Sequence, residues 1–102
     1  MIRLKPNAHK AWEKRGTALV RLGRDREAIA SFNKALEVKP DYARAHYYKA
    51  TCYARQEKVE PAIASLQRAI ELDSRSQEDA KSDQAFSAIL ANKAFQQVIN
   101  GA

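Results

Sequence analysis

Residues 12–40 read WEKRGTALVRLGRDREAIASFNKALEVKP and decide how the chain folds. In the second half of this stretch, apolar side chains from Ala28 to Leu36 follow the i, i+1, i+4, i+7, i+8 spacing of a helix with one buried face. In the first half, small and apolar residues gather on one broad side of a helix, with charged residues opposite. Gly23 lies between the halves and supplies the left-handed backbone that ends a helix. The stretch predicts two amphipathic helices that pack antiparallel, because their connection is short.

The same residues predict where these two helices begin and end. The first should start after an N-cap at Asn7 and run to about Leu22. The second should run from Asp25 to Val38. Gly16 stands in the middle of the first helix, where glycine costs about 1 kcal/mol relative to alanine. We therefore expect a facing helix to come close to it.

Residues 43–76 repeat residues 9–42 at a spacing of 34 positions. The identical pairs are Ala11 and Ala45, Thr17 and Thr51, Arg21 and Arg55, Ala28 and Ala62, Ile29 and Ile63, Ala30 and Ala64, Ser31 and Ser65, Ala35 and Ala69, and Glu37 and Glu71. Asp41 replaces Asn7 as the expected N-cap. Pro61 falls in the first turn of the fourth predicted helix, where its missing N–H costs little. The chain thus contains two copies of one two-helix unit.

The repeated unit resembles the tetratricopeptide repeat. The residues that carry the resemblance are Trp12, Gly16, Leu19, Ala28, Phe32 and Pro40, whereas Arg15 and Lys49 stand where the family pattern has Leu. It implies an all-α, right-handed helical-repeat solenoid with two antiparallel helix-turn-helix units and a C-terminal capping helix. The implied division is a tail of a preceding repeat in residues 1–8, repeats in 9–42 and 43–76, and the capping helix in 77–102. On this interpretation the chain is a fragment of a longer array.

The last segment breaks the period. Residues 74–82 are polar and predict a linker, and a helix should follow from Asp83 to Asn100, with Gly101 as its stop. One side of that helix would carry Leu90, Ala91, Ala94, Phe95 and Val98, and another side would carry Phe86 and Ile89. Two interpretations stay open: the helix shields the end of the second repeat, or Phe86 and Ile89 contact another chain.

Composition and charge narrow the classes of function. The 102 residues carry a net charge of +6, and the basic residues concentrate before residue 77. This bias suits an acidic protein or a nucleic acid, and a solvated surface without any ligand explains it equally. The single cysteine excludes an internal disulfide, and no apolar run approaches the roughly 20 residues that span a bilayer. We therefore expect a cytoplasmic protein.

Catalysis finds little support in the residue types present. His9, His46 and Cys52 are too few and too badly spaced for a metal site, because ligands on one helix stand at i and i+4. Cys52 corresponds to Ala18 of the first copy and should be a packed, reduced thiol. Trp12 lies on the buried side of its helix and should anchor the core. We expect no enzymatic activity, no metal and no cofactor.

The candidate binding surface is the stripe that faces away from the apolar side on the first helix of each unit. In proteins that this chain resembles, the first helices line a concave groove that receives an extended peptide or a partner's helix. The stripe residues are Lys10, Glu13, Lys14, Thr17 and Arg21 in the first copy and Arg44, Tyr47, Tyr48, Thr51 and Arg55 in the second. Their basic groups can pair with acids, the threonines can bond a peptide backbone, and the tyrosines offer flat apolar area.

We therefore expect a non-enzymatic scaffold that binds a protein or peptide of acidic character on its concave face, and no membrane. The chaperone-tail-binding branch of the family has Lys and Asn where Glu13 and Thr17 stand here, which argues against a carboxylate clamp. Single-stranded RNA is the competing partner, because tyrosines within a basic stripe also stack bases. A third alternative is a homo-oligomer formed through the C-terminal helix or an exposed N-terminal end.

Overall fold

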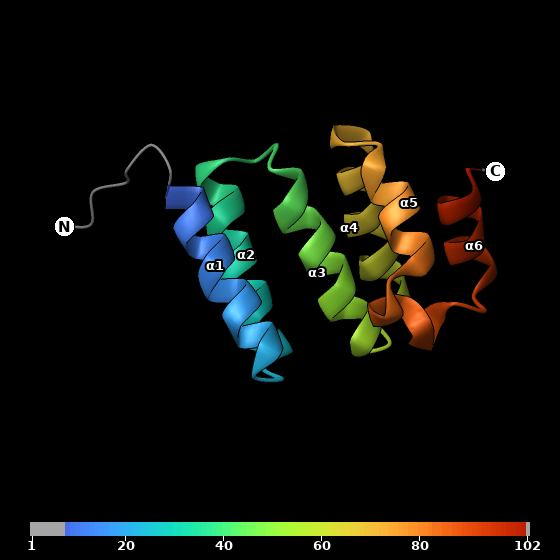
Figure 1. Cartoon of the computed structure of the whole chain (residues 1–102), viewed down its shortest axis with the longest axis horizontal. Helices are drawn as coiled ribbons and strands as arrows, with labels where there is room; N and C mark the ends of the chain where they lie inside the picture. The colour runs from blue at the N-terminus through green and yellow to red at the C-terminus, as the bar shows by residue number, and fades with distance from the viewer. Residues whose placement is uncertain (1–7, 102) are drawn as a thin grey trace.

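The computed structural model describes residues 8–101, and every regular element in that range is a helix. The elements are α1 (Ala8–Arg21), α2 (Asp25–Val38), α3 (Ala43–Arg55), α4 (Val59–Leu72), α5 (Arg75–Ser82), the 3-10 helix η1 (Gln84–Ile89) and α6 (Lys93–Asn100). The hairpins α1–α2 and α3–α4 stand side by side, and the C-terminal segments follow at the far end (Figure 1). This is the expected all-α helical-repeat solenoid. The predicted Asn7 cap and residues 1–7 of the predicted tail lie outside the described range.

The two-helix unit forms as predicted. α2 has the predicted bounds, and Gly23 has φ 76° just after α1. Glu57 occupies the matching place after α3 with φ 58°, so a non-glycine residue makes the same left-handed turn there. Pro61 is the third residue of α4 and lies in its first turn, as expected.

The predicted N-cap of the second copy is wrong. The residue in the cap position of α3 is Tyr42 rather than Asp41, and no side chain caps the first turn. The Tyr42 carbonyl already accepts the N–H of Ala45 at 3.1 Å, so the helix starts one residue later than the repeat predicts. Asp41 is exposed on the connection before it.

A close contact between α1 and α2 sets the spacing of the first hairpin. A Cβ added to Gly16 would lie 2.7 Å from Cζ of Phe32, and Phe32 is fully buried. The corresponding pair in the second hairpin is Ala50 and Leu66, which are also fully buried. The larger residue on the first helix is thus matched by a smaller residue on the second. Both hairpins keep a filled interior without overlap.

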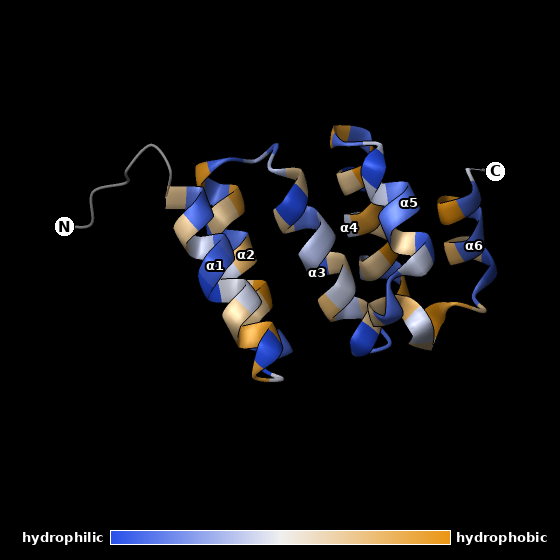
Figure 2. Ribbon diagram, viewed as in Figure 1, coloured by the Kyte–Doolittle hydropathy of each residue, from blue (hydrophilic) through white to orange (hydrophobic). Residues whose placement is uncertain are grey.

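Two hydrophobic clusters make up the core, and α3 contributes to both. The first cluster contains Leu19, Ala28, Phe32, Ala35, Ala45 and Cys52. The second contains Ala50, Ala54, Ala62, Leu66, Ala80, Phe86, Ile89, Phe95 and Ile99. Trp12, predicted to anchor the core, is only partly buried and packs against the edge of the first cluster. Cys52 is fully buried, as expected. Figure 2 shows apolar residues interleaved with polar ones along α1 to α4 and α6, which is typical of amphipathic helices around a thin core.

A row of aromatic rings connects the two clusters. Phe32 stacks on Tyr48 at 5.4 Å between ring centroids, and Tyr48 meets Tyr47 edge to face at 6.2 Å. Tyr47 in turn meets Phe86 at 5.8 Å, and Phe86 stacks on Phe95 at 5.2 Å. Rings at these separations attract one another beyond the area they bury. The row therefore runs from the interior of the first hairpin to the C-terminal segment.

The C-terminal region differs from its prediction. Residues 74–82, predicted to be a linker, contain helix α5, which packs against α4 and α6. The single helix predicted from Asp83 to Asn100 is wrong, because the chain forms the short helices η1 and α6 instead. Gly101 has φ 71° and ends α6, as predicted.

The break has a local cause in two capping side chains. Asp83 Oδ1 accepts the N–H of Ala85 at 2.9 Å, and Asn92 Oδ1 accepts the N–H of Phe95 at 3.1 Å. Each side chain satisfies a backbone donor that a helix start leaves free. Two starts therefore fall within the stretch that was predicted to be one helix.

The interpretation of Phe86 and Ile89 as a surface for another chain is wrong. Their exposed fractions are 1% and 3%, and both belong to the second cluster. In a 3-10 helix residues i and i+3 lie on the same side, so η1 directs both side chains into the core. On the side predicted to be apolar, Phe95 is buried, whereas Leu90 is exposed.

Replacing Gly16 by alanine should lower the free energy of unfolding by about 1–2 kcal/mol. The added methyl group overlaps the ring of Phe32, and this overpacking should exceed the gain in helix propensity. Adding Phe32→Leu copies the Ala50 and Leu66 pair and should recover most of the loss. Urea unfolding followed by circular dichroism, with Phe32→Leu alone completing the cycle, measures the coupling. Strictly additive losses would contradict this account of the contact.

Candidate functional site

Two adjoining hollows lie along the side of the molecule formed by α1, α3 and α5, each with a volume of about 380 Å³. The N-terminal hollow is lined by Lys10, Glu13, Lys14, Thr17, Arg21, Tyr42, Arg44 and Tyr48. The C-terminal hollow is lined by Ala43, Arg44, Tyr47, Tyr48, Asp73, Arg75, Ser76 and Asp79. Arg44 and Tyr48 belong to both linings, so the two hollows form one groove.

Glu13 organises the N-terminal hollow. Glu13 is only 7% exposed, and its carboxylate oxygen Oε2 lies 2.9 Å from Nε of Arg44. The Tyr42 hydroxyl donates a hydrogen bond to Oε1 of the same carboxylate. These two contacts connect α1 with the start of α3. Burial, and next the hydrogen bond to Glu13, raise the pKa of Tyr42 to about 12.

Arg44 forms the wall between the hollows together with Tyr48. Its guanidinium donates to the Tyr48 hydroxyl at 3.4 Å and lies 5.9 Å from the centroid of that ring. The Tyr48 hydroxyl bond is the main cause that raises the pKa of Arg44. Since Arg44 already pairs with Glu13, it fixes the wall and adds little free positive charge to the groove.

Three cations of the predicted stripe stay open to solvent. Lys10, Lys14 and Arg21 line the N-terminal hollow, are exposed, and form no ion pair within the described residues. Thr17 lies beside them, half-buried, and donates to the carbonyl of Lys14 at 3.0 Å. A ligand in this hollow would therefore meet mainly positive charge.

Two residues of the predicted stripe do not join the groove. Arg55 donates two hydrogen bonds of 3.0 Å to the carboxylate of Asp25, which connects α3 to α2. Thr51 is only 4% exposed, and its hydroxyl donates to the carbonyl of Tyr48 at 2.7 Å. Burial keeps Thr51 from the role of bonding a peptide backbone, and Arg55 is occupied by its internal partner.

The C-terminal hollow brings in residues that the sequence pattern did not indicate. Asp73, Arg75, Ser76 and Asp79 come from the start of α5 and the turn before it, where a linker was predicted. The signal that could have identified this helix is weak, because only Ser76 and Ala80, four residues apart, are buried.

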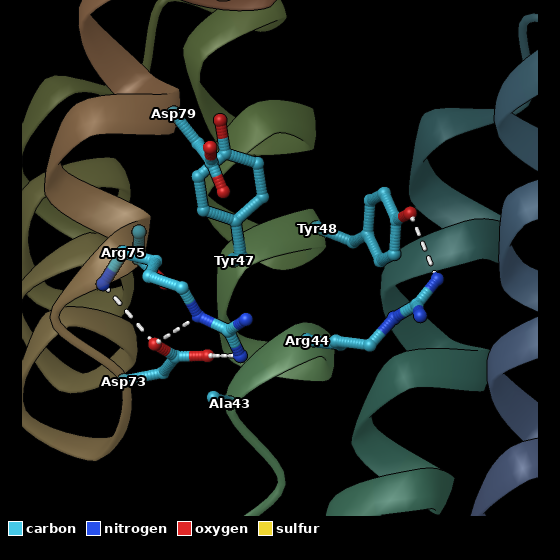
Figure 3. A pocket seen from close by; sticks show the side chains of 8 residues that line it. Ala43, Arg44, Tyr47, Tyr48, Asp73, Arg75 and Asp79 are labelled. Carbon is cyan, nitrogen blue, oxygen red and sulfur yellow. Dashed lines mark hydrogen bonds and ion pairs between the residues drawn. The ribbon is translucent and has the colours of Figure 1, made fainter.

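Tyr47 and Tyr48 form the aromatic side of the C-terminal hollow. Figure 3 shows the two rings on α3, with Asp79 beside Tyr47 and the Asp73–Arg75 pair below. The Tyr47 hydroxyl donates to Asp83 Oδ2 at 2.8 Å, so the ring is held in place from the far side. Burial, and then the Asp83 hydrogen bond, raise the pKa of Tyr47 well above its usual range. Tyr47 is therefore neutral at physiological pH.

Cys52 and His46, two of the side chains considered for catalysis, are buried or engaged in a contact within the fold. Burial raises the pKa of the Cys52 thiol to about 11, so it stays protonated at neutral pH. His46 is half-buried with Nε2 3.0 Å from the Pro40 carbonyl, and burial lowers its pKa. Among residues 8–101 no cluster of His, Cys, Asp and Glu is suited to a metal ion, and no helix is long and apolar enough to cross a membrane.

Replacing Glu13 by glutamine should lower the pKa of Tyr42 part of the way from about 12 toward its ordinary value of 10.0, because one of its causes is removed. The folded-state pKa lies above the unfolded value. The neutral phenol therefore stabilises the fold below about pH 10, and this contribution is lost as the pH rises to about 12. Ultraviolet titration, with Tyr42→Phe as the reference, measures the shift. An unchanged titration would contradict the Glu13 contact.

Comparison with known proteins places the chain in a family. The sequence model of the tetratricopeptide repeat matches residues 2–39 and 13–78. A DnaJ homolog subfamily C member 7 homolog of Dictyostelium discoideum is 36% identical over 62 residues, which are 61% of this chain and 12% of that protein. The peroxisomal targeting signal receptor of Saccharomyces cerevisiae is 37% identical over 46 residues, 45% of this chain and 8% of the receptor.

A third relative, the protein STIP1 homolog of Dictyostelium discoideum, is 26% identical over 87 residues, which are 83% of this chain and 15% of that protein. The chain thus spans at most 15% of the length of each of these relatives. The family model, in contrast, covers most of the chain and both helical hairpins. The chain belongs to the tetratricopeptide repeat family.

Proposed function

We propose that this chain is a non-enzymatic interaction module that binds a segment of a partner protein in the groove. Tetratricopeptide repeats are protein-interaction modules, which supports the general class of function. The observation that carries the proposal is the N-terminal hollow, where Lys10, Lys14 and Arg21 are exposed beside the ring of Tyr48. Such a surface suits acidic side chains together with flat apolar contacts.

The groove is suited to binding because its walls are already held in place. Glu13, Arg44 and Tyr48 are connected by an ion pair and a hydrogen bond before any ligand arrives. Tyr48 also stacks on the buried ring of Phe32. Binding then orders few side chains of the module, and less of the interaction energy is spent on conformational entropy.

Internal acidic side chains fit this site better than a free carboxyl terminus. A terminal carboxylate needs several donors around one point, whereas the buried position in this hollow is itself a carboxylate, Glu13. The printed name of the yeast relative describes a receptor for a targeting signal. By analogy, we propose that this chain recognises a short linear segment in an extended or helical form.

The test is to select binders from a library of random peptides. Each peptide has about ten residues, which as an extended chain reach roughly 30 Å. Lys14→Gln with Arg21→Gln should weaken the selected peptides about tenfold or more, because charge-assisted hydrogen bonds are lost. Fluorescence anisotropy measures the affinities, and circular dichroism checks the fold.

Arg68→Gln with Lys93→Gln is the matched control, because both residues are exposed, carry the same charge and lie outside both linings. This control should bind within about twofold of the unmodified protein. Equal weakening in both double variants would contradict a local site and indicate general charge attraction. Tighter binding of single-stranded oligouridylate than of any selected peptide, lost steeply with salt, would favour the RNA alternative.

A further inference from the structure

The C-terminal hollow differs in charge from the N-terminal hollow when residues that already form ion pairs are set aside. Its charged residues are Arg44, Asp73, Arg75 and Asp79. Arg44 pairs with Glu13 at 2.9 Å, and Arg75 pairs with Asp73 at 2.8 Å. Asp79 has no ion-pair partner within the described part of the chain. The carboxylate left without an ion pair in this hollow is therefore that of Asp79, which the Arg75 guanidinium affects only at longer range, although the whole chain is basic.

Asp79 lies against an aromatic surface. Figure 3 shows its side chain beside the Tyr47 ring, with the Tyr48 ring on the other side of the opening. The two rings meet edge to face at 6.2 Å, and the Tyr47 hydroxyl is held by Asp83. A carboxylate next to one tyrosine ring, with a second ring lining the same hollow, is the combination that attracts an ammonium or guanidinium group.

Of the two cations that line this hollow, Arg44 forms its wall and Arg75 does not fill it. The side chain of Arg75 is 85% exposed and lies at the rim. Asp73 accepts three hydrogen bonds from Arg75, two from its guanidinium and one from its backbone N–H, at 2.8–3.1 Å. The hollow of about 380 Å³ is within the usual size range of small-ligand pockets. Room for an incoming basic side chain therefore remains between Asp79 and the tyrosines.

We propose that the C-terminal hollow receives a lysine or arginine side chain of the same segment whose acidic residues occupy the N-terminal hollow. The inference rests on the proposed function and adds the charge pattern of the partner. Arg44 and Tyr48 separate the two halves of the groove, so the acidic and basic parts of the segment lie on opposite sides of this wall. Side chains on one face of an extended chain repeat every two residues, about 7 Å apart, so a few residues separate the charges.

The charge pattern also gives the segment a direction. Its acidic part lies over α1 and its basic part over α5. Reversing the order of residues would place like charges together in both hollows, which is unfavourable. The groove should therefore distinguish a segment from its reversed sequence, a property that a uniformly basic surface would lack.

The test uses peptides selected from the random library by the unmodified protein, by Asp79→Asn and by Glu78→Gln. Glu78 lies on the same helix, pairs with Lys81 at 3.0 Å and stays outside the lining, so it is the matched control. Peptides selected by the unmodified protein and by Glu78→Gln should carry acidic and basic residues at a constant spacing. Peptides selected by Asp79→Asn should keep the acidic residues and lose the enrichment in basic ones.

A double-mutant cycle on one selected peptide completes the test. Replacing its basic residue by glutamine should weaken binding about fivefold to the unmodified protein and less than about twofold to Asp79→Asn. The same loss in both proteins, or selected peptides without basic residues, would overturn the inference while the proposed function stands. A library that yields no binder, or binders indifferent to Lys14→Gln with Arg21→Gln, would overturn both.

Discussion

The close approach of Gly16 to Phe32 is the contact on which the other features of the molecule depend. It sets how near α2 lies to α1, and it leaves the Phe32 ring free to stack on Tyr48 across the boundary between the hairpins. Tyr48 then forms part of the wall of the groove. A glycine in the interior of one helix is thus connected, through two rings, to the surface proposed for binding. In the second hairpin, Ala50 and Leu66 fill the corresponding space between the two helices. The two hairpins therefore fill this space with different residue types.

The electrostatics of the groove follow from local pairing and cannot be read from the net charge. The chain carries +6, yet two cations of the predicted stripe are paired with carboxylates of the chain itself. Arg44 is paired with Glu13 and Arg55 with Asp25. What remains uncompensated is positive over α1 and negative over α5. A segment bound as proposed would therefore meet a change of sign within one surface.

The hairpins could be predicted from the sequence because their apolar periodicity and the turn glycine of the first hairpin act locally. The end of the chain could not, because two side chains that cap helices, Asp83 and Asn92, interrupt a stretch that is apolar enough for one helix. Helix α5 was not predicted because its buried face consists of the small residues Ser76 and Ala80, which give no clear apolar pattern. In the candidate site, the five stripe residues of α1 line one hollow, and their role in binding stays a prediction. The Asp25 partner of Arg55 and the burial of Thr51 depend on tertiary contacts that a helical wheel does not contain.

The sharing of α3 between the two clusters also bears on how the chain folds. Ala45 and Cys52 belong to one cluster, whereas Ala50 and Ala54 belong to the other. The main packing contacts join helices that are neighbours along the chain, so little loop-closure entropy opposes them and rapid folding is expected. Either hairpin could form first. The core of the first hairpin is complete only when α3, as part of the second hairpin, docks on it, so the two halves should unfold together rather than one after the other.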